Sequence, residues 1–371
     1  MKRKLVVLLI AAMTGVMLFG CGSASGSGES AGAKTASEDA DAQYAEAEAE
    51  PADSASDETQ AETSETKAAD SDTADVEEAS DAESEEADED DENYETGDAG
   101  LDDPRNQDGI GDKEILVVSF GTSYNDSRRL TIGAIEQAIA DAYPDWSVRR
   151  AFTSQIIIDH VKERDGEAID NVKEALDRAV DNGVKELVIQ PTHLMDGFEY
   201  NDLIDEVASY SDAFDKVAVG DPLLISDDDI DQVAGIVHDS TASYDDGKTA
   251  VCFMGHGTEA DSNAVYDKVQ KAFDEKGYEN YYIGTVEATP SLDDVIAAID
   301  GKGYDRVMLR PLMVVAGDHA NNDMAGEEDD SWKSILEADG YEVVTVLEGL
   351  GQLPEIQQMY VARAGEAIKD I

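Results

Sequence analysis

Three side chains with metal-ligand chemistry stand at regular intervals in the last third of the chain. His256 and His319 are two of only five histidines, and Glu287 lies 31 residues after the first and 32 before the second. Each follows a short apolar run, and the interval is about one strand-plus-helix unit. Two imidazoles and one carboxylate suit a borderline divalent ion, and three protein ligands leave positions open for exchange. The sequence therefore predicts an open metal site at these three residues.

The elements that must position these residues alternate short strands with longer helices from residue 113 onward. The first part predicts strands at 115–120, 148–152 and 186–190 and helices at 130–142, 169–181 and 200–209. The second part predicts strands at 250–254, 281–286, 306–309 and 342–347 and helices at 264–275, 292–300 and 354–368. This alternation indicates an α/β fold of parallel sheets flanked by helices, in which ligands bind at the carboxyl ends of the strands.

The two parts are related by an internal repeat. VVSFGTS at 117–123 matches CFMGHGT at 252–258 through a shared Gly-Thr pair, and ELVIQPTHLMDGFE at 186–199 aligns with RVMLRPLMVVAGDH at 306–319 without a gap. We therefore expect two Rossmann-like halves, 111–247 and 248–371, related by a pseudo-two-fold repeat and facing each other across a cleft. The second alignment pairs Glu199 with His319 and His193 with Met313, so Glu199 and His193 are expected to face the cleft from the first half.

Three other residues of ligand type are expected to be structural. His160 and His238 fall within or beside helical stretches, which favours surface or packing positions. Cys252 lies inside an apolar strand, where a cysteine usually acts as a small buried hydrophobe.

The composition of the chain is strongly acidic. Asp and Glu number 85 against 27 Lys and Arg, giving a net charge of −58, and there are two cysteines. This disfavours nucleic-acid binding and a disulfide-stabilised scaffold. Residues 22–110 consist mainly of Ala, Ser, Glu, Asp and Thr, so they cannot bury enough apolar surface to fold, and we predict a disordered linker. A solvated spacer is the favoured interpretation, and a carboxylate store for metal ions is the alternative.

The N-terminus has the pattern of an export signal. Lys2, Arg3 and Lys4 precede an apolar run at 5–19, which is shorter than the ~20 residues of a spanning helix. Leu18-Phe19-Gly20-Cys21 resembles the lipobox of bacterial lipoproteins. This resemblance implies a signal peptide at 1–21, a lipid on Cys21 and a membrane-anchored protein on the extracytoplasmic side. An ordinary signal or a short anchor is the alternative.

Residues 113–371 resemble the anaerobic-type sirohydrochlorin cobaltochelatases of the class II chelatase group. The matching phrases are LVVSFGTSY at 116–124, RRAFTSQIII at 149–158, FMGHGT at 253–258 and PLMVVAGDHANNDMAGEEDDSWK at 311–333. In that family the histidines of the GHG and GDH phrases and the glutamate of the VE-x-x-P phrase bind the metal, and they fall on His256, His319 and Glu287. A further family acid falls on Glu199.

The resemblance implies insertion of Co²⁺ into sirohydrochlorin, a lyase reaction of cobalamin biosynthesis that releases two pyrrole protons and uses no ATP or other nucleotide. His256 would accept a proton, Glu287 and His319 would hold the ion, and Glu199 would relay protons or metal from the opposite wall. The ligand set also suits Ni²⁺, Fe²⁺ or Zn²⁺. Family members often carry further histidines after the GHG phrase, whereas Glu259, Ala260 and Asp261 follow here.

Recognition of the pigment requires compensation of charge. Sirohydrochlorin is a polycarboxylate, and residues 111–371 have a net charge of −33, which slows the approach of an anion. Basic side chains could offset this repulsion, and each could equally be an ion-pair residue. The candidates are Arg128, Arg129, Arg149, Arg150 and Arg310.

Export leaves other function classes open. A tethered protein of this fold could capture cobalt, haem or another tetrapyrrole for an importer without turnover. A third class is a surface metal-binding protein in which the acidic tail binds the ions. The same three ligands would serve a chelatase and a capture protein, and a homo-oligomer is possible in each class.

Overall fold

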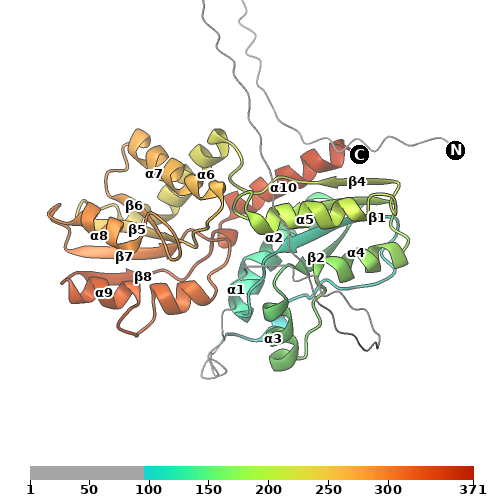
Figure 1. Ribbon diagram of the computed structural model, residues 1–371, viewed down its shortest axis with the longest axis horizontal. Coiled ribbons are helices and arrows are strands. Elements are labelled where there is room, and N and C mark those ends of the chain that lie inside the picture. The colour runs from blue at the N-terminus through green and yellow to red at the C-terminus, as the bar shows by residue number, and fades with distance from the viewer. Residues whose placement is uncertain (1–95) are drawn as a thin grey trace, which may run out of the picture. The chain divides into compact units, whose positions relative to one another are not determined.

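A computed structural model describes residues 96–371, which form two parallel sheets flanked by helices (Figure 1). The predicted signal peptide with Cys21, and the predicted linker up to residue 95, lie outside the described residues. No described helix combines the length and the apolar composition that crossing a membrane requires.

The first sheet has four parallel strands in the order β2-β1-β3-β4. They are β1 (Lys113–Ser119), β2 (Ser147–Phe152), β3 (Glu186–Pro191) and β4 (Lys216–Val219). In the central strand, Ile115 stands beside Val148 of β2 and Val188 of β3. Every residue of β1 after Lys113 is buried, as expected of a parallel strand with helices on both faces.

The second sheet repeats this plan in the order β6-β5-β7-β8. Its strands are β5 (Thr249–Gly255), β6 (Tyr281–Thr285), β7 (Arg306–Pro311) and β8 (Glu342–Thr345). The two sheets match strand for strand, with β1 and β5 at equivalent central positions. The predicted α/β fold of two related parallel sheets is therefore confirmed.

Helices connect the strands of each sheet. The first sheet has α1 (Asn125–Leu130), α2 (Ile132–Ala142), α3 (Gln155–Asp165), α4 (Val172–Asp181) and α5 (Phe198–Ser209). The remaining helices are α6 (Asp227–Thr241), α7 (Ala264–Lys276), α8 (Leu292–Ile299), α9 (Trp332–Ala338) and α10 (Pro354–Lys369). Capping boxes begin α4 at Asn171, α6 at Ser226 and α8 at Ser291.

The predicted elements are present, and the structure adds several others. The helix predicted at 130–142 is divided at Thr131. Helices α3, α6 and α9 and strand β4 were not predicted. Strand β4 and α9 have four and seven residues, too few for a periodic pattern to show. Helix α6 begins with three consecutive Asp residues, which resemble a loop but stabilise a helix N-terminus.

The two sheets share one hydrophobic core. A cluster of buried residues includes Val117 and Val188 of the first sheet together with Phe253 of the second and Tyr360 of α10. Helix α10 packs against α2 and β3 of the first sheet, and Figure 1 shows it in red among those elements. The Tyr360 hydroxyl donates a hydrogen bond of 2.9 Å to the carbonyl oxygen of Thr192. The last helix therefore fastens the second half to the first.

Residues 96–112 form an ordered segment that we call the N-terminal strap. The Asp102 side chain is only 2% exposed, and its carboxylate accepts hydrogen bonds from Arg128 Nε at 2.8 Å and Arg150 Nη1 at 2.6 Å. Arg105 lies 3.3 Å from the buried carboxylate of Glu136. The prediction that the disordered linker extends to residue 110 is wrong for residues 96–110. The composition of this segment resembles the acidic linker, but the negative charge of Asp102 is neutralised by the buried Arg128 and Arg150.

The histidines outside the predicted site have the structural roles expected of them. His238 stacks on Tyr278 with ring centroids 3.7 Å apart and an interplanar angle of 9°. His160 lies on α3 and is partly buried. Cys252 is fully buried in β5, and burial raises the pKa of its thiol. The prediction that Cys252 is a buried hydrophobe is confirmed.

Candidate metal centre

The structure brings His256, Glu287 and His319 together at the carboxyl ends of β5, β6 and β7. One potential ligand atom from each residue lies within 4.8 Å of the other two. His256 Nε2 is 3.6 Å from Glu287 Oε1, and the two imidazole centroids are 4.7 Å apart. Two nitrogens and one oxygen in this arrangement can bind one borderline divalent ion. We call these three residues the metal trio.

Backbone contacts fix the loops that carry His256 and Glu287. The Glu287 amide donates to the carbonyl oxygen of His256 at 2.9 Å. Gly257 has a φ of +93°, and a Cβ at this position would lie 2.8 Å from the amide nitrogen of Ala288. Only glycine fits this left-handed position so close to the neighbouring loop. Gly257 therefore allows the loops after β5 and β6 to pack side by side.

Hydrogen bonds at Nδ1 orient both imidazoles. His256 Nδ1 lies 2.9 Å from the carbonyl oxygen of Gly257, which can only accept, so Nδ1 carries the ring proton in the neutral form. His319 Nδ1 lies 2.7 Å from the carboxylate of Asp323, in the π-helical turn Ala320–Met324. In each ring Nε2 is then the nitrogen that can bind an ion, and the carboxylate behind His319 increases its basicity.

The metal trio is open on one side. The side chains of His256 and Glu287 are each 44% exposed, whereas that of His319 is 18% exposed. An ion held here keeps coordination positions for water or for an incoming ligand, because the protein supplies three groups. The chemistry therefore suits temporary holding of a metal more than permanent structural binding.

Glu199 lies on the first-half side of the site. It is exposed in the first turn of α5 and is not one of the three clustered ligands. A Cβ built on Gly197 would lie 3.5 Å from Glu199 Oε2 and 3.9 Å from Ser262 Oγ. Since Ser262 follows His256 by six residues, Glu199 lies beside the loop that leaves the metal trio.

His193 follows β3 and has an unusual environment. Both of its ring nitrogens are buried and have no hydrogen-bond partner among the described residues. Burial lowers the pKa of His193 to about 4, so the ring is neutral near neutral pH. Its backbone carbonyl accepts from the Leu223 amide at 3.0 Å. Its imidazole therefore retains an unused acceptor nitrogen.

The arginines predicted to contact an anionic substrate are internal. Arg128 pairs with Asp102 and Glu167, and Arg149 is 2.7 Å from Glu114, with both arginine side chains 0% exposed. Arg310 is 1% exposed and donates to the carbonyl oxygen of Glu348.

Two further candidates have carboxylate partners as well. Arg150 is buried between Asp102 and Glu136, and Arg129 pairs with Asp126 at the surface. The prediction that Arg128, Arg149 and Arg310 bind substrate is not supported, because guanidinium groups enclosed in this way offer no surface to a ligand. Apart from Asp126, which is three residues from Arg129, the partner acids lie 14 or more residues away in the sequence, which is why the local pattern did not reveal the pairs.

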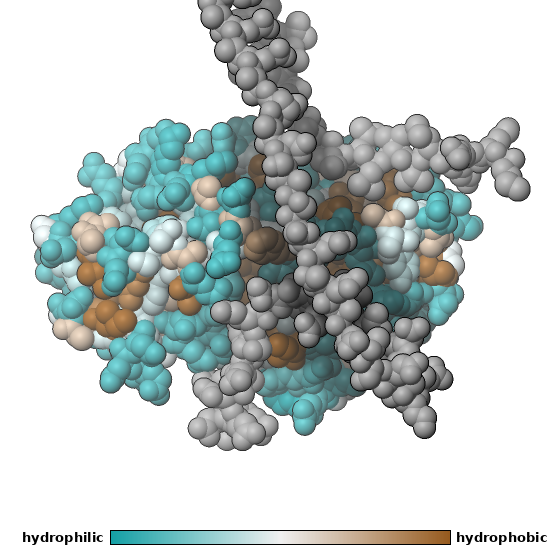
Figure 2. Space-filling view, viewed as in Figure 1, coloured by the Kyte–Doolittle hydropathy of each residue, from teal (hydrophilic) through white to brown (hydrophobic). Residues whose placement is uncertain are grey.

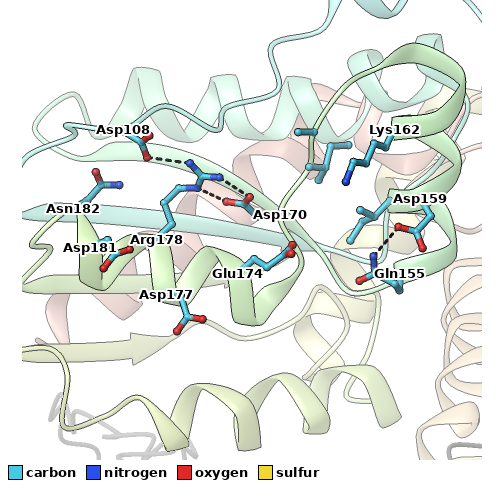
Figure 3. Close-up of a pocket in the computed structure, with 13 residues that line it drawn as sticks. Asp108, Gln155, Asp159, Lys162, Asp170, Glu174, Asp177, Arg178, Asp181 and Asn182 are labelled. Atoms are coloured by element: carbon cyan, nitrogen blue, oxygen red, sulfur yellow. Dashed lines mark hydrogen bonds and ion pairs between the residues drawn. The ribbon is translucent and has the colours of Figure 1, made fainter.

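A hollow of about 650 Å³ lies elsewhere, between α3 and α4 of the first half (Figure 3). Acidic side chains dominate its lining, and the figure shows Arg178 held between Asp108 and Asp170. None of its lining residues belongs to the metal trio. The metal trio therefore lies outside this hollow.

Comparison with known proteins identifies the family. Residues 113–369 match the model of the cobalt chelatase (CbiK) family. Sirohydrochlorin cobaltochelatase of Salmonella typhimurium is 37% identical over 256 residues, which cover 69% of this chain and 96% of that protein. Sirohydrochlorin cobaltochelatase CbiKC of Nitratidesulfovibrio vulgaris is 31% identical over 242 residues, which cover 65% of this chain and 85% of that protein.

A solved structure of SirB from Bacillus subtilis with Fe³⁺ is similar at a TM-score of 0.48 and 14% identity, covering 69% of this chain and 96% of that one. The family match and the two relatives in the preceding comparison establish that this chain belongs to the cobalt chelatase family.

Proposed function

We propose that this protein is a sirohydrochlorin cobaltochelatase that inserts Co²⁺ into sirohydrochlorin. The observation that carries the proposal is the metal trio, with its three ligand atoms within 4.8 Å of one another at an open rim. Family membership supports cobalt as the metal, and the names of the two relatives support the pigment. Co²⁺ is the substrate ion of this reaction.

The proposed reaction conserves charge, because one Co²⁺ ion replaces two protons. One Co²⁺ ion forms bonds to the pyrrole nitrogens, and two pyrrole N–H bonds break and release two protons. No electron is transferred and no phosphoryl group is used, so we propose that insertion requires no ATP. The protein must hold the ion, release it stepwise and accept the protons.

His256 is suited to exchanging the ion for a proton. Its Nε2 lone pair binds the ion first, because Nδ1 is occupied by its hydrogen bond to Gly257. When the ion moves to a pyrrole nitrogen, the same lone pair becomes available for a pyrrole proton. The 44% exposure of the His256 side chain lets that proton pass on to solvent. Glu287 and His319 hold the ion while the first bond to the pigment forms.

The opposite wall offers further acceptors. We propose that Glu199 accepts or relays the second proton, since it is an exposed carboxylate beside Ser262 of the second half. His193 contributes a neutral imidazole with an unused acceptor nitrogen. These roles correspond to the pairing of Glu199 with His319 and of His193 with Met313 in the internal repeat.

The choice of cobalt is not determined by the ligand types alone. Two imidazoles and a carboxylate also accept Ni²⁺ and Fe²⁺. We propose Co²⁺ as the metal of the reaction, with the other two as competitors. Parallel insertion assays with each ion under anaerobic conditions test this order, and faster insertion of Ni²⁺ or Fe²⁺ at equal free concentration would contradict it.

The experiment that tests the function is anaerobic incubation of the full chain with sirohydrochlorin and Co²⁺, followed by absorbance. We expect catalysed metallation by the wild type and only the uncatalysed rate with a His256→Ala, His319→Ala double variant. His160→Ala is the matched control, because His160 lies on α3 of the first half and is not one of the clustered ligands. Binding of pigment and ion without acceleration by the wild type would instead indicate a capture protein.

We further propose that the protein is exported and anchored through a lipid on Cys21. The support is the sequence pattern of residues 1–21, with a basic start, a short apolar run and a cysteine after Leu18-Phe19-Gly20. Cys21→Ser is expected to abolish labelling by a fatty acid and to release the protein from the membrane fraction. Unchanged labelling and unchanged membrane association of the variant would contradict this proposal.

A further inference from the structure

Helix α1 contacts two segments that are far apart in the chain. One is the N-terminal strap, and the other is the segment 312–319, which runs from the end of β7 to His319. Figure 1 shows α1 on the side of the first half that adjoins the second. Through α1, the start of the described chain is therefore connected to a ligand of the metal trio.

The backbone of the strap lies directly against the first turn of α1. The Asp126 amide donates to the carbonyl oxygen of Thr96 at 2.7 Å, and Asn125 Nδ2 donates to that of Gly97 at 3.2 Å. Gly97 has a φ of +96°, and a Cβ at this position would collide with the Asp126 side chain. Glycine is therefore needed for this close approach of the strap to the helix.

A buried arginine continues the connection from the strap. Arg128 is 0% exposed and donates from Nε to the Asp102 carboxylate at 2.8 Å and from Nη1 to the carbonyl oxygen of Thr122 at 3.3 Å. Its Nη2 donates to Glu167 at 2.8 Å. Thr122 in turn approaches the segment 312–319, because a Cβ on Gly317 would lie 3.1 Å from Thr122 Oγ1. Asp102 therefore fixes a guanidinium that holds a neighbour of this segment.

Ser127 makes the direct contact between α1 and the segment 312–319. The Ala316 amide donates to Ser127 Oγ at 3.0 Å, and both residues are buried. Earlier in the segment, the carbonyl oxygen of Met313 accepts from the Leu350 amide of the second half at 2.8 Å. A buried amide that loses its acceptor is costly, so removal of the Ser127 hydroxyl should displace this part of the chain. Ser127 thus anchors the segment three residues before His319.

The attachment of the strap depends on polar groups. Its buried residues are Thr96 and Arg105, and Leu101 is 64% exposed. The surface drawn in Figure 2 is likewise mainly hydrophilic, with separate hydrophobic patches. Because the strap, which the structure describes in full, contributes no fully buried apolar side chain, loss of the charge on Asp102 should loosen both the strap and α1.

We propose that the N-terminal strap, acting through α1 and Ser127, positions His319 for metal binding. The strap precedes residues 113–369, which match the family model, so it adds to the matched part of the chain. The inference rests on the proposed function only in taking the metal trio as the Co²⁺ site. Asp102 and Ser127 are positioning residues, because neither belongs to the clustered ligands.

The test is an anaerobic Co²⁺ titration of the full chain without pigment. Ser127→Ala is expected to weaken Co²⁺ binding about tenfold, as loss of other groups behind a metal ligand does. Asp102→Asn acts from further away and should weaken it about threefold. Ser127→Thr keeps the hydroxyl and should retain wild-type affinity.

The absorption spectrum of bound Co²⁺ at saturation provides a second readout. It should change in Ser127→Ala, because a displaced imidazole alters the coordination geometry of the ion. A loss of stability alone would reduce the folded fraction and leave the spectrum of the bound ion unchanged.

Matched controls exist for both substitutions. Ser154→Ala removes a hydroxyl that accepts the Ile157 amide at the start of α3, and Asp103→Asn removes the charge of the adjacent, exposed strap residue. Both should bind Co²⁺ as the wild type does. Circular dichroism under the titration conditions verifies that each variant is folded. Ser127→Ala leaves no unpaired buried charge, so it tests the proposal even where Asp102→Asn unfolds.

The outcomes separate this inference from the proposed function. Wild-type Co²⁺ affinity in folded Ser127→Ala or in folded Asp102→Asn would overturn the positioning role of the strap. Equal losses in Ser127→Ala and Ser127→Thr would overturn it too, because the hydroxyl would then not be the group that matters. A wild type that binds Co²⁺ without accelerating its insertion into sirohydrochlorin would overturn the chelatase assignment and leave the positioning of His319 intact.

Discussion

The two sheets have the same strand order and opposite chemistry at their carboxyl edges. The second sheet places His256, Glu287 and His319 after its first three strands, whereas the first places Phe120, Ile156 and Phe198 there. The repeat preserved the backbone plan, and the residues after the strands diverged. A fold built twice thus has metal ligands at one carboxyl edge and exposed apolar side chains at the other.

The interiors of the halves differ as well. The first sheet encloses Arg128, Arg149 and Arg150 with carboxylate partners. The core cluster beneath the metal trio contains apolar residues such as Met254, Leu309 and Trp332. Most of the buried arginines therefore lie in the half without the metal, with Arg310 of β7 as the buried arginine of the second half, and removal of one partner of such a pair has a large effect on stability.

The largest expected effect concerns the N-terminal strap. Asp102→Asn leaves Arg128 and Arg150 with less negative charge, and breaking a buried pair costs about 3–5 kcal/mol in the free energy of unfolding. Urea denaturation of the full chain at pH 7 measures this change. Asp103→Asn is the control, because the adjacent Asp103 is exposed. If both variants unfold at the same urea concentration, the strap is not part of the folded first half.

The same pair predicts a loss of stability in acid. Burial alone would raise the pKa of Asp102, but hydrogen bonds and charges from Arg150 and Arg128 outweigh it and hold the pKa below its usual value. A depressed pKa means that the stabilisation exists above the unfolded-state value near 3.8 and disappears as the pH falls through the lower folded-state value. The difference between wild type and Asp102→Asn should therefore shrink in strong acid.

A substitution of Asp323, which contacts His319, tests the metal site of the second half. Asp323→Asn removes the carboxylate that lies 2.7 Å from His319 Nδ1 and should weaken Co²⁺ binding by about 10- to 100-fold. Binding of the metal-free pigment should be unaffected, because Asp323 acts on the bound ion through His319. Asp330→Asn is the control, since that residue is exposed in the same stretch. Equal Co²⁺ affinity in the two variants would show that Asp323 does not support the metal ligand.

His193 gives the first half a distinct response to pH. Burial lowers the pKa of His193 to about 4 from 6.5, so the unfolded chain binds the proton more readily between these values. Stability should therefore fall as the pH drops from about 6.5 to 4, by up to tenfold in the folding equilibrium per pH unit. His193→Phe should flatten this part of the profile, and His160→Ala should not. A profile unchanged by His193→Phe would show that the buried ring is not neutral.

The smallest effect is that of salt, and it should have opposite signs for the two ligands. Residues 111–371 carry a net charge of −33, so screening should strengthen binding of the anionic pigment a few-fold and weaken binding of Co²⁺. Titrations at about 0.02 M and 0.2 M salt compare the two. Weaker pigment binding at high salt would point to attractive cationic contacts and would contradict the predicted repulsion by the net negative charge.

Much of this organisation could be predicted from the sequence. The strand-and-helix alternation and the two internal alignments indicated both sheets, because parallel strands buried on both faces leave a strong apolar pattern. The metal trio was predicted because ligand types at intervals of one βα unit return to one edge of a sheet.

Other features depend on contacts that sequence spacing does not encode. The pairing of Arg149 with Glu114 joins neighbouring strands that are 35 residues apart in the chain, and Asp102 lies in a stretch whose composition resembles the acidic linker. The contact between Asp323 and His319 has an i,i+4 spacing, which would have indicated it if the turn had been recognised as helical. The exposed positions of Phe120, Ile156 and Phe198 were missed because single exposed apolar residues after strands carry no periodic signal.

The most direct test of the metal trio is a pigment titration of the His256→Ala, His319→Ala double variant alongside a Co²⁺ titration of the same protein. The account predicts that the variant loses Co²⁺ binding and keeps wild-type affinity for sirohydrochlorin, because the substituted histidines are ligands of the ion. A fall in pigment affinity that parallels the loss of Co²⁺ binding would contradict it.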